Sequence, residues 1–254
     1  MGTKIPDWDS IYQNFASLSI KRIESLAALN LKGRRILDVG CWWGWYIRYA
    51  RERNAEVYGI DNETSRIKDA AEFLCNMDGL GVADAERIPY KADTFDAVFS
   101  YHVLEHIETD GQMIKEIYRI LKRDGDLIIG VPNEYSLGLL PYRPIRWLLK
   151  HWESHLRKHG KYDWLKSISY SDSSHYREYT KKSLCKILSD HRFYIANIRS
   201  YGFAMPYPFK NRISKSVRVF LSRFLGPITP GFLREELILH ARKIIESQKT
   251  QYHV

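Results

Sequence analysis

The stretch ILDVGCWWGWYIRYA, residues 36–50, joins an apolar run to a glycine-bearing turn and then to a helical pattern. Asp38 lies near the end of the apolar run, and Gly40 and Gly44 follow it. A buried strand that passes through a tight turn into a helix is typical of a nucleotide-binding βα unit. Such turns carry a third glycine where Trp42 stands here. A dinucleotide needs bare backbone at that position because its pyrophosphate approaches the chain closely, so the turn predicts a cofactor without a pyrophosphate.

Strand and helix patterns alternate outward from this turn. The helical pattern at 110–122 places apolar residues on one face and is expected to end at Asp124–Gly125. This alternation predicts a parallel sheet with helices on both faces, whose ligands bind at the carboxyl ends of the strands. The expected strands lie at residues 35–40, 57–61, 80–84, 95–101 and 126–132, and the expected helices at 44–53, 63–76 and 110–122.

The last third of the chain departs from this alternation. Strand patterns at about 193–200 and at 235–243 have no convincing crossover helix between them, which favours an antiparallel pair. We therefore expect an α/β fold: a Rossmann-like, doubly wound, mostly parallel seven-stranded sheet with a late antiparallel strand pair and two inserts. The expected divisions of this single domain (1–254) are an N-terminal helical cover (1–34), a cofactor-binding core (35–133), a basic and aromatic insert (135–175), the late helix and strand pair (176–201 and 235–243), and an amphipathic basic insert (202–234).

Charge is distributed unevenly along the 254 residues. Residues 1–130 hold 17 Lys and Arg against 21 Asp and Glu, a net charge of −4, and residues 131–254 hold 22 against 9, a net charge of +13, which together give the formal +9. An acidic first half and a basic second half predict a cofactor module with an anion-facing surface. The alternative is a basic face that is merely solvated.

Cysteine use and the N-terminus bear on location. Cys41, Cys75 and Cys185 show no metal or redox spacing, which suits a reduced compartment. The first ten residues, MGTKIPDWDS, contain no apolar signal core, and no apolar run approaches the roughly 18 residues that span a bilayer. These features predict a cytoplasmic protein, with peripheral attachment to the inner face of the membrane as an alternative.

Four stretches carry a family resemblance. They are ILDVGCWWG (36–44), VYGIDNETSRIKDA (57–70), VADAERIPYKADTFDAVFSYHVLEHI (82–107) and EIYRILKRDGDLIIGVPN (116–133). Together they resemble the class I S-adenosylmethionine-dependent methyltransferases, and within them the branch called methyltransferase type 11. The resemblance implies a methyltransferase enzyme whose cofactor is S-adenosyl-L-methionine, which has no phosphate and tolerates Trp42 in the turn.

The resemblance also implies roles for residues at the strand ends. Asp61 would accept hydrogen bonds from both ribose hydroxyls, and Asp84 would accept one from the adenine amino group. Trp42 or Trp43 either lines the pocket near the sulfonium, which an aromatic face attracts, or packs against the N-terminal helix. The expected cofactor-binding residues are Asp38, Gly40, Cys41, Trp42, Gly44, Asp61, Asn62, Asp84, Ala85, Glu86, Ser100 and Tyr101.

Histidines supply the candidates for catalysis. A hydroxyl acceptor must lose a proton, and His102 and His175 are the candidate general bases. His102, Glu105 and His106 share one face if this segment is helical. With His175 as a distant fourth ligand they form an alternative metal site, although the preferred interpretation has no metal and gives Glu105 and His106 structural roles.

The acceptor is the least determined part of the prediction. We expect methyl transfer to oxygen of a small-molecule, glycan or lipid-linked acceptor, and an anionic one would suit the basic half. The alternatives are an RNA methyltransferase, a non-catalytic S-adenosylmethionine-binding module and, least favoured, an NAD-dependent oxidoreductase. Nucleic acid is the less expected partner, because no RNA-binding module is evident.

Residues 210–226 form a second feature that bears on partners. Ile213, Val217, Phe220, Leu221 and Phe224 would share one helical face, with four cationic side chains off it. This pattern predicts either contact with a membrane surface or packing on the protein's own core.

Overall fold

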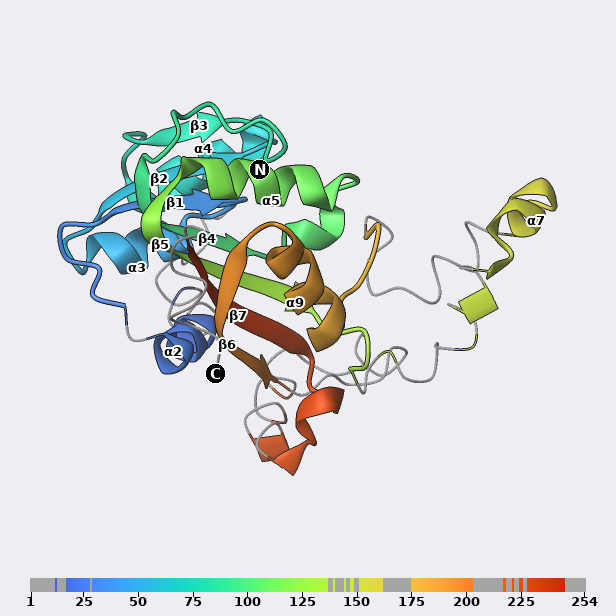
Figure 1. Cartoon of the computed structure of the whole chain (residues 1–254). Coiled ribbons are helices and arrows are strands. Elements are labelled where there is room, and N and C mark those ends of the chain that lie inside the picture. The colour runs from blue at the N-terminus through green and yellow to red at the C-terminus, as the bar shows by residue number, and fades with distance from the viewer. Residues whose placement is uncertain are drawn as a thin grey trace, which may run out of the picture.

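The computed structural model describes residues 12, 17–27, 29–136, 139, 144, 147–148, 151–161, 175–202, 217, 221, 224–225 and 228–244. Its centre is a seven-stranded sheet of order β3-β2-β1-β4-β5-β7-β6 (Figure 1). β1 to β5 are parallel, and β7 runs antiparallel to both β5 and β6, so the predicted sheet and its late antiparallel pair are confirmed. The strands are β1 (Arg35–Val39), β2 (Glu56–Asp61), β3 (Leu80–Val82), β4 (Phe95–Tyr101), β5 (Leu121–Pro132), β6 (Phe193–Tyr201) and β7 (Glu236–Lys243).

Helices cover both faces of the sheet because alternate residues of its strands point to opposite sides. In β1, Leu37 and Val39 pack with α5 (Asp110–Ile120) and α9 (Lys181–Asp190). Ile36, which precedes Leu37 and belongs to the opposite face, packs with α2 (Ser17–Leu26), α3 (Trp45–Arg51) and α4 (Thr64–Leu74). Both layers are apolar, as expected for strands buried on two faces. Figure 1 shows α7 (Glu153–Lys158) set apart from the sheet.

The predicted end of the helix at 110–122 is wrong. α5 ends at Ile120, and Leu121 already pairs with Phe95 of β4 as the first residue of β5. Asp124 has φ 58°, so Asp124–Gly125 forms a turn within the irregular first part of β5 instead of closing the helix. A positive φ at Asp124 is compatible with a helix end and with a turn inside a strand, and the pairing with β4 decides between them.

The segment after β4 is also less regular than a helix. His102 has φ 57°, and η2 (Leu104–His106) is a single 3₁₀ turn. The expectation that His102, Glu105 and His106 share one helix face is therefore wrong, because His102 precedes the turn in a left-handed conformation.

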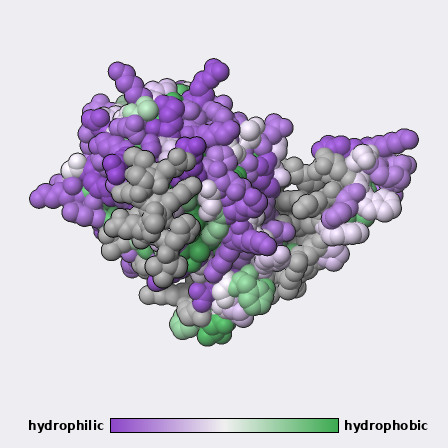
Figure 2. All heavy atoms as spheres, in the orientation of Figure 1, coloured by the Kyte–Doolittle hydropathy of each residue, from purple (hydrophilic) through white to green (hydrophobic). Residues whose placement is uncertain are grey.

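The two inserts are described only in part, and the predicted domain divisions remain a prediction. Of the apolar stripe in 210–226, Ile213 and Phe220 lie outside the described residues, whereas Val217 and Phe224 are 45% and 61% exposed. Figure 2 shows apolar residues at the lower end of the molecule, where Figure 1 draws η4 (Gly231–Leu233) and the residues before it. Among the described residues, no helix has the length and hydropathy needed to cross a bilayer.

Candidate cofactor and acceptor site

The turn after β1 is shaped by its two glycines. Gly40 and Gly44 have φ 74° and 75°, a conformation in which a side chain is strained. The N–H groups of Gly40 and Cys41 both donate to the carbonyl of Ile60 at the end of β2, at 2.8 and 3.0 Å. A Cβ on Gly40 would lie closer than 3.0 Å to the side chain of Val103. The turn and the loop after β4 are therefore in direct contact, which brings the predicted cofactor side and the predicted acceptor side together.

Asp61 ends β2 beside this turn and is 3% exposed. Its Oδ2 accepts a hydrogen bond from the Trp42 N–H at 3.2 Å, and its Oδ1 accepts one from the Glu63 N–H at 3.1 Å. The carboxylate is held in one orientation, and each oxygen keeps a lone pair for a further donor. This geometry fits a ligand with two neighbouring hydroxyl groups, such as a ribose. Asn62, the next residue, is exposed.

Trp42 lies at the surface of the turn. Its side chain is 51% exposed, and the Arg66 guanidinium lies 5.1 Å from its ring centroid. The indole contacts Trp43 edge to face with 5.2 Å between centroids. Trp42 is therefore exposed next to Asp61, and its predicted place in the cofactor pocket stays a prediction.

Two buried polar groups on β1 and β4 have unsatisfied atoms. Asp38 is 1% exposed and its Oδ2 has no hydrogen-bond partner among the described residues, and the same holds for Oγ of Ser100, which is also 1% exposed. Burial raises the pKa of Asp38 to about 8, and the nearby Asp61 carboxylate adds to this shift. A buried acceptor without a donor is costly, so a ligand carrying an amino group fits this position.

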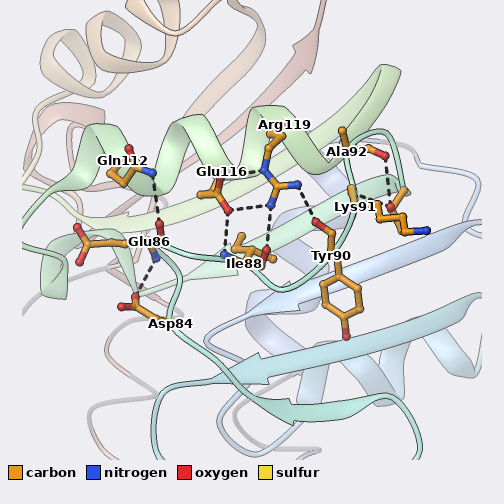
Figure 3. Close-up of polar contacts among 10 residues, drawn as sticks. Asp84, Glu86, Ile88, Tyr90, Lys91, Ala92, Gln112, Glu116 and Arg119 are labelled. Atoms are coloured by element: carbon orange, nitrogen blue, oxygen red, sulfur yellow. Dashed lines mark hydrogen bonds and ion pairs between the residues drawn. The ribbon is translucent and has the colours of Figure 1, made fainter.

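The loop after β3 carries the expected adenine-binding residues. Asp84 is exposed, its Oδ1 accepts a hydrogen bond from the Glu86 N–H at 2.8 Å, and Ala85 is 8% exposed. Figure 3 shows how α5 holds this loop: Glu116 accepts from the Ile88 N–H at 2.9 Å.

Arg119 completes the attachment of this loop to α5. It binds Glu116 and donates to the carbonyl of Ile88 at 2.9 Å and to that of Tyr90 at 2.7 Å (Figure 3). Sequence reasoning missed Glu116 and Arg119, because polar residues on an amphipathic helix are usually solvated. Their i, i+3 spacing is visible in the sequence, but the loop that they bind is not.

A network of buried charges lies at the carboxyl ends of β4 and β5. Glu236 begins β7, is 4% exposed, and accepts a hydrogen bond from the Tyr101 hydroxyl while pairing with Arg22 of α2. His102 lies between two carboxylates, with Nε2 3.4 Å from Glu236 and Nδ1 3.0 Å from Glu105. The network places Tyr101 and His102, both predicted site residues, side by side with a ring separation of 4.7 Å.

These contacts set the charge of His102. Burial opposes its protonation, but Glu105 and Glu236 together raise the pKa of His102 to about 10. Because 41% of the side chain is exposed, solvent screens part of this effect, and the direction is what matters. A general base must begin as a neutral ring with a free nitrogen, so the role predicted for His102 remains a prediction that this geometry disfavours.

The second predicted base, His175, lies in the carboxylate–histidine cluster of Glu105, His106 and His175, and Glu105 also contacts His102. One donor atom from each lies within 4.8 Å of the others, and Oε2 of the fully buried Glu105 has no hydrogen-bond partner among the described residues. The N–H of Tyr176 donates to the Glu105 carbonyl at 2.8 Å, which anchors this part of the chain. The cluster can pass a proton or hold a divalent ion with two nitrogens and one oxygen. Of the four residues in the alternative metal set, the structure brings these three together, whereas His102 contacts Glu105 through Nδ1 and Glu236 through Nε2.

Arg22 and Glu236 are site residues that sequence reasoning missed. They are separated by 214 residues and come from the N-terminal helix and the last strand. Neither stands in a motif, and Glu236 begins an apolar strand where a charged first residue is unremarkable. No local signal predicts that these two residues meet.

Comparisons with known proteins show similarity to methyltransferases. Residues 37–129 match the family described as a methyltransferase domain. The chain is 36% identical over 113 residues to a cycloartenol-C-24-methyltransferase of Arabidopsis thaliana, which covers 41% of this chain and 34% of that protein. It is 31% identical over 128 residues to a ubiquinone biosynthesis O-methyltransferase of Alkalilimnicola ehrlichii, which covers 44% of this chain and 52% of that protein. In both relatives the match spans well under two thirds of the length.

A solved structure extends the likeness to most of the chain. An S-adenosylmethionine dependent methyltransferase from Mesorhizobium loti superposes with a TM-score of 0.57 at 18% identity, covering 84% of this chain and 93% of that one. At this identity the likeness concerns the fold.

Proposed function

We propose that this chain is a class I S-adenosylmethionine-dependent methyltransferase that transfers the methyl group of S-adenosylmethionine to oxygen of a small-molecule, glycan or lipid-linked acceptor. The observation that carries the proposal is the contact between Gly40 in the cofactor turn and Val103 in the loop after β4. It brings the glycine-shaped turn against the segment that holds Tyr101 and the histidines, as direct transfer between two bound molecules requires.

The residues of this chain fit the cofactor along its length. Asp61 suits the ribose hydroxyls, and the unsatisfied Oδ2 of Asp38 suits the amino group at the methionine end. In this proposal Asp84 and the backbone of Ala85 bind adenine, on a loop that α5 holds. Bound S-adenosylmethionine supplies a methyl group already activated by its sulfonium. The protein's tasks are therefore to bind both molecules, orient them and exclude water.

Transfer to oxygen also requires removal of a proton from the acceptor hydroxyl. In this proposal the imidazoles of His106 and His175 receive it, since their rings lie 4.7 Å apart next to the buried Glu105. His102 instead contributes positive charge, because both of its ring nitrogens face carboxylates. The acid–base work is thus assigned to the carboxylate–histidine cluster and the positive charge to His102.

The acceptor class rests on the relatives and on charge. One relative carries O-methyltransferase in its name and the other C-24-methyltransferase, and this chain has the histidines that transfer to oxygen needs. The basic second half of the chain, with a net charge of +13, favours an anionic acceptor or an anionic surface. We extend the proposal to peripheral contact with anionic lipid near Phe224 and Ile228, which are 61% and 75% exposed.

Transfer of labelled methyl from S-adenosylmethionine to fractionated pools tests the function. Small-molecule, glycan, lipid and RNA fractions from one lysate would be incubated with the wild type and with the Asp61→Ala variant as control. We expect label in a small-molecule, glycan or lipid fraction and much less label with the variant. Label confined to RNA would replace the proposed acceptor class. Binding of S-adenosylhomocysteine without transfer to any fraction would favour a non-catalytic binding module.

A further inference from the structure

We propose that Glu236 is a positioning residue for the transfer reaction. It holds the hydroxyl proton of Tyr101 and the ring of His102, so that the Tyr101 oxygen is left as a hydrogen-bond acceptor facing the methyl acceptor. The inference rests on the proposed function and deepens it, because an oxygen that can only accept selects an acceptor molecule that donates through a hydroxyl or an N–H group.

Topology brings Glu236 to this position. β7 runs antiparallel to β5, and Glu236 lies opposite Pro132, the last residue of β5. The first residue of β7 therefore stands at the same edge of the sheet as the carboxyl ends of β1 and β4, where the cofactor turn lies. Glu236 lies opposite Tyr201 of β6 on its other side, so its backbone is fixed between two strands.

Packing holds the ring of Tyr101 in place, and Glu236 accepts the hydrogen bond from its hydroxyl. A Cβ on Gly130 of β5 would lie closer than 3.0 Å to the Tyr101 ring, so the ring lies directly over this glycine. Tyr46 packs against it with 5.4 Å between ring centroids. A phenol has one proton, and the Tyr101 hydroxyl donates it to Glu236. The lone pairs of the oxygen can then only accept hydrogen bonds.

Three groups that can donate hydrogen bonds surround the Glu236 carboxylate: Arg22, Tyr101 and His102. The Arg22 and Glu236 side chains are 14% and 6% exposed, and His102 approaches Glu236 Oε2 at 3.4 Å. A buried carboxylate without a cation is strongly destabilising, and Arg22 and the charged ring of His102 together permit a negative charge here. α2 thereby becomes part of the acceptor side. The competing explanation is that the Arg22–Glu236 pair only fastens α2 to the sheet.

Variants can separate positioning from fastening. Glu236→Gln removes the charge while keeping the size, and Glu235→Gln is the matched control, since Glu235 lies near Arg22 but makes neither of the contacts to Tyr101 and His102. Glu236→Gln alone leaves the buried Arg22 without its carboxylate partner. The double variant Arg22→Met with Glu236→Gln removes both members of this pair and so avoids that cost. Each protein would be assayed for turnover on the acceptor fraction that the wild type labels, KM for S-adenosylmethionine, S-adenosylhomocysteine affinity and melting temperature.

Positioning predicts a split between binding and turnover. Glu236→Gln should lower turnover on the order of 10²-fold and leave KM for S-adenosylmethionine within about twofold, because the cofactor site is intact. Glu235→Gln should stay within about twofold of the wild type in turnover and in KM for S-adenosylmethionine. The double variant should melt close to the wild type and still turn over slowly. Tyr101→Phe should also lower turnover. Because the two residues act together, the variant that combines Tyr101→Phe with Glu236→Gln should lose less turnover than the two single fold-losses multiplied together.

Two results would overturn the inference. Turnover restored together with melting temperature in the double variant would show that the pair only fastens α2. Equal turnover of the wild type and Glu236→Gln would show that the Tyr101 proton does not matter. Failure of the proposed function is distinguishable from both, since it would appear as a wild type that binds S-adenosylhomocysteine and labels no fraction.

Discussion

Cofactor binding should release a proton from Asp38. The carboxyl is 1% exposed, its pKa is raised to about 8 chiefly by burial, and its Oδ2 has no hydrogen-bond partner among the described residues. With a pKa of about 8, roughly nine tenths of the Asp38 carboxyls carry a proton at pH 7 in the free protein. A cationic amino group placed beside this carboxyl favours its ionised form. We therefore expect about 0.9 proton released per bound cofactor at pH 7.

Calorimetry with S-adenosylhomocysteine measures this release. This ligand keeps the amino group and lacks the sulfonium, so it isolates the contact with Asp38. The apparent binding enthalpy, compared between phosphate and Tris buffers at pH 7, gives the number of protons transferred. The association constant should also rise by about tenfold per pH unit below pH 8 and then level off, because the free form carries the proton and the bound form does not.

Asp38→Asn is the matched variant. It keeps the shape of the side chain and cannot ionise, so proton release should vanish and affinity should become independent of pH in this range. In the free protein, a folded-state pKa above the unfolded value of 3.8 means that protonated Asp38 contributes stability that is complete below that pH and is lost as pH rises through about 8. Asp38→Asn should therefore melt higher than the wild type at pH 9. Equal binding enthalpies in the two buffers would refute the reasoning, since Asp38 would then keep its proton in the complex.

Four further predictions concern the turn, the cluster and the surface. Asp61→Ala should weaken S-adenosylhomocysteine binding at least about tenfold in calorimetry, because charge-assisted hydrogen bonds are worth about 1.5–3 kcal/mol each. Gly40→Ala should lower the melting temperature by several degrees more than Gly33→Ala, since both glycines have positive φ but only Gly40 would also meet a neighbouring side chain. A chelator should leave labelled-methyl transfer unchanged, because the preferred mechanism uses the carboxylate–histidine cluster as hydrogen-bonded groups. Phe224→Asp should weaken co-sedimentation with phosphatidylserine vesicles, which should also fall steeply with salt.

Each of these predictions has a contrary outcome. An unchanged dissociation constant in a folded Asp61→Ala variant would remove that residue from the ribose site. Equal melting temperatures of Gly40→Ala and Gly33→Ala would mean that the contact of a Cβ at position 40 with Val103 does not destabilise the fold. Activity lost with chelator and restored by Mn²⁺ would establish a metal in the carboxylate–histidine cluster. Absence of vesicle binding by the wild type would contradict the proposed contact of the exposed apolar residues with anionic lipid.

Much of the fold could be predicted because its signals are local. The apolar runs at 35–40 and 95–101 alternate with helical patterns, and each strand needs only its own residues to be recognised. The positive φ that the turn after β1 requires is supplied by Gly40 and Gly44, and Asp61 follows at the end of the next strand. The helix end at Asp124–Gly125 was predicted wrongly, since the same pair suits a helix end and a turn within a strand.

The sequence by itself therefore determined the order of the elements, the cofactor turn and the expected carboxylates at the strand ends. Those features depend on residues within a few positions of one another. Only the tertiary structure decided that Glu236 meets Arg22 and Tyr101, and that His102 lies between two carboxylates while His106 joins His175. The partner of a buried charge is chosen by which chain segments the sheet brings to one edge. Antiparallel β7 carries its first residue to that edge across more than a hundred residues, and no spacing in the sequence records that approach.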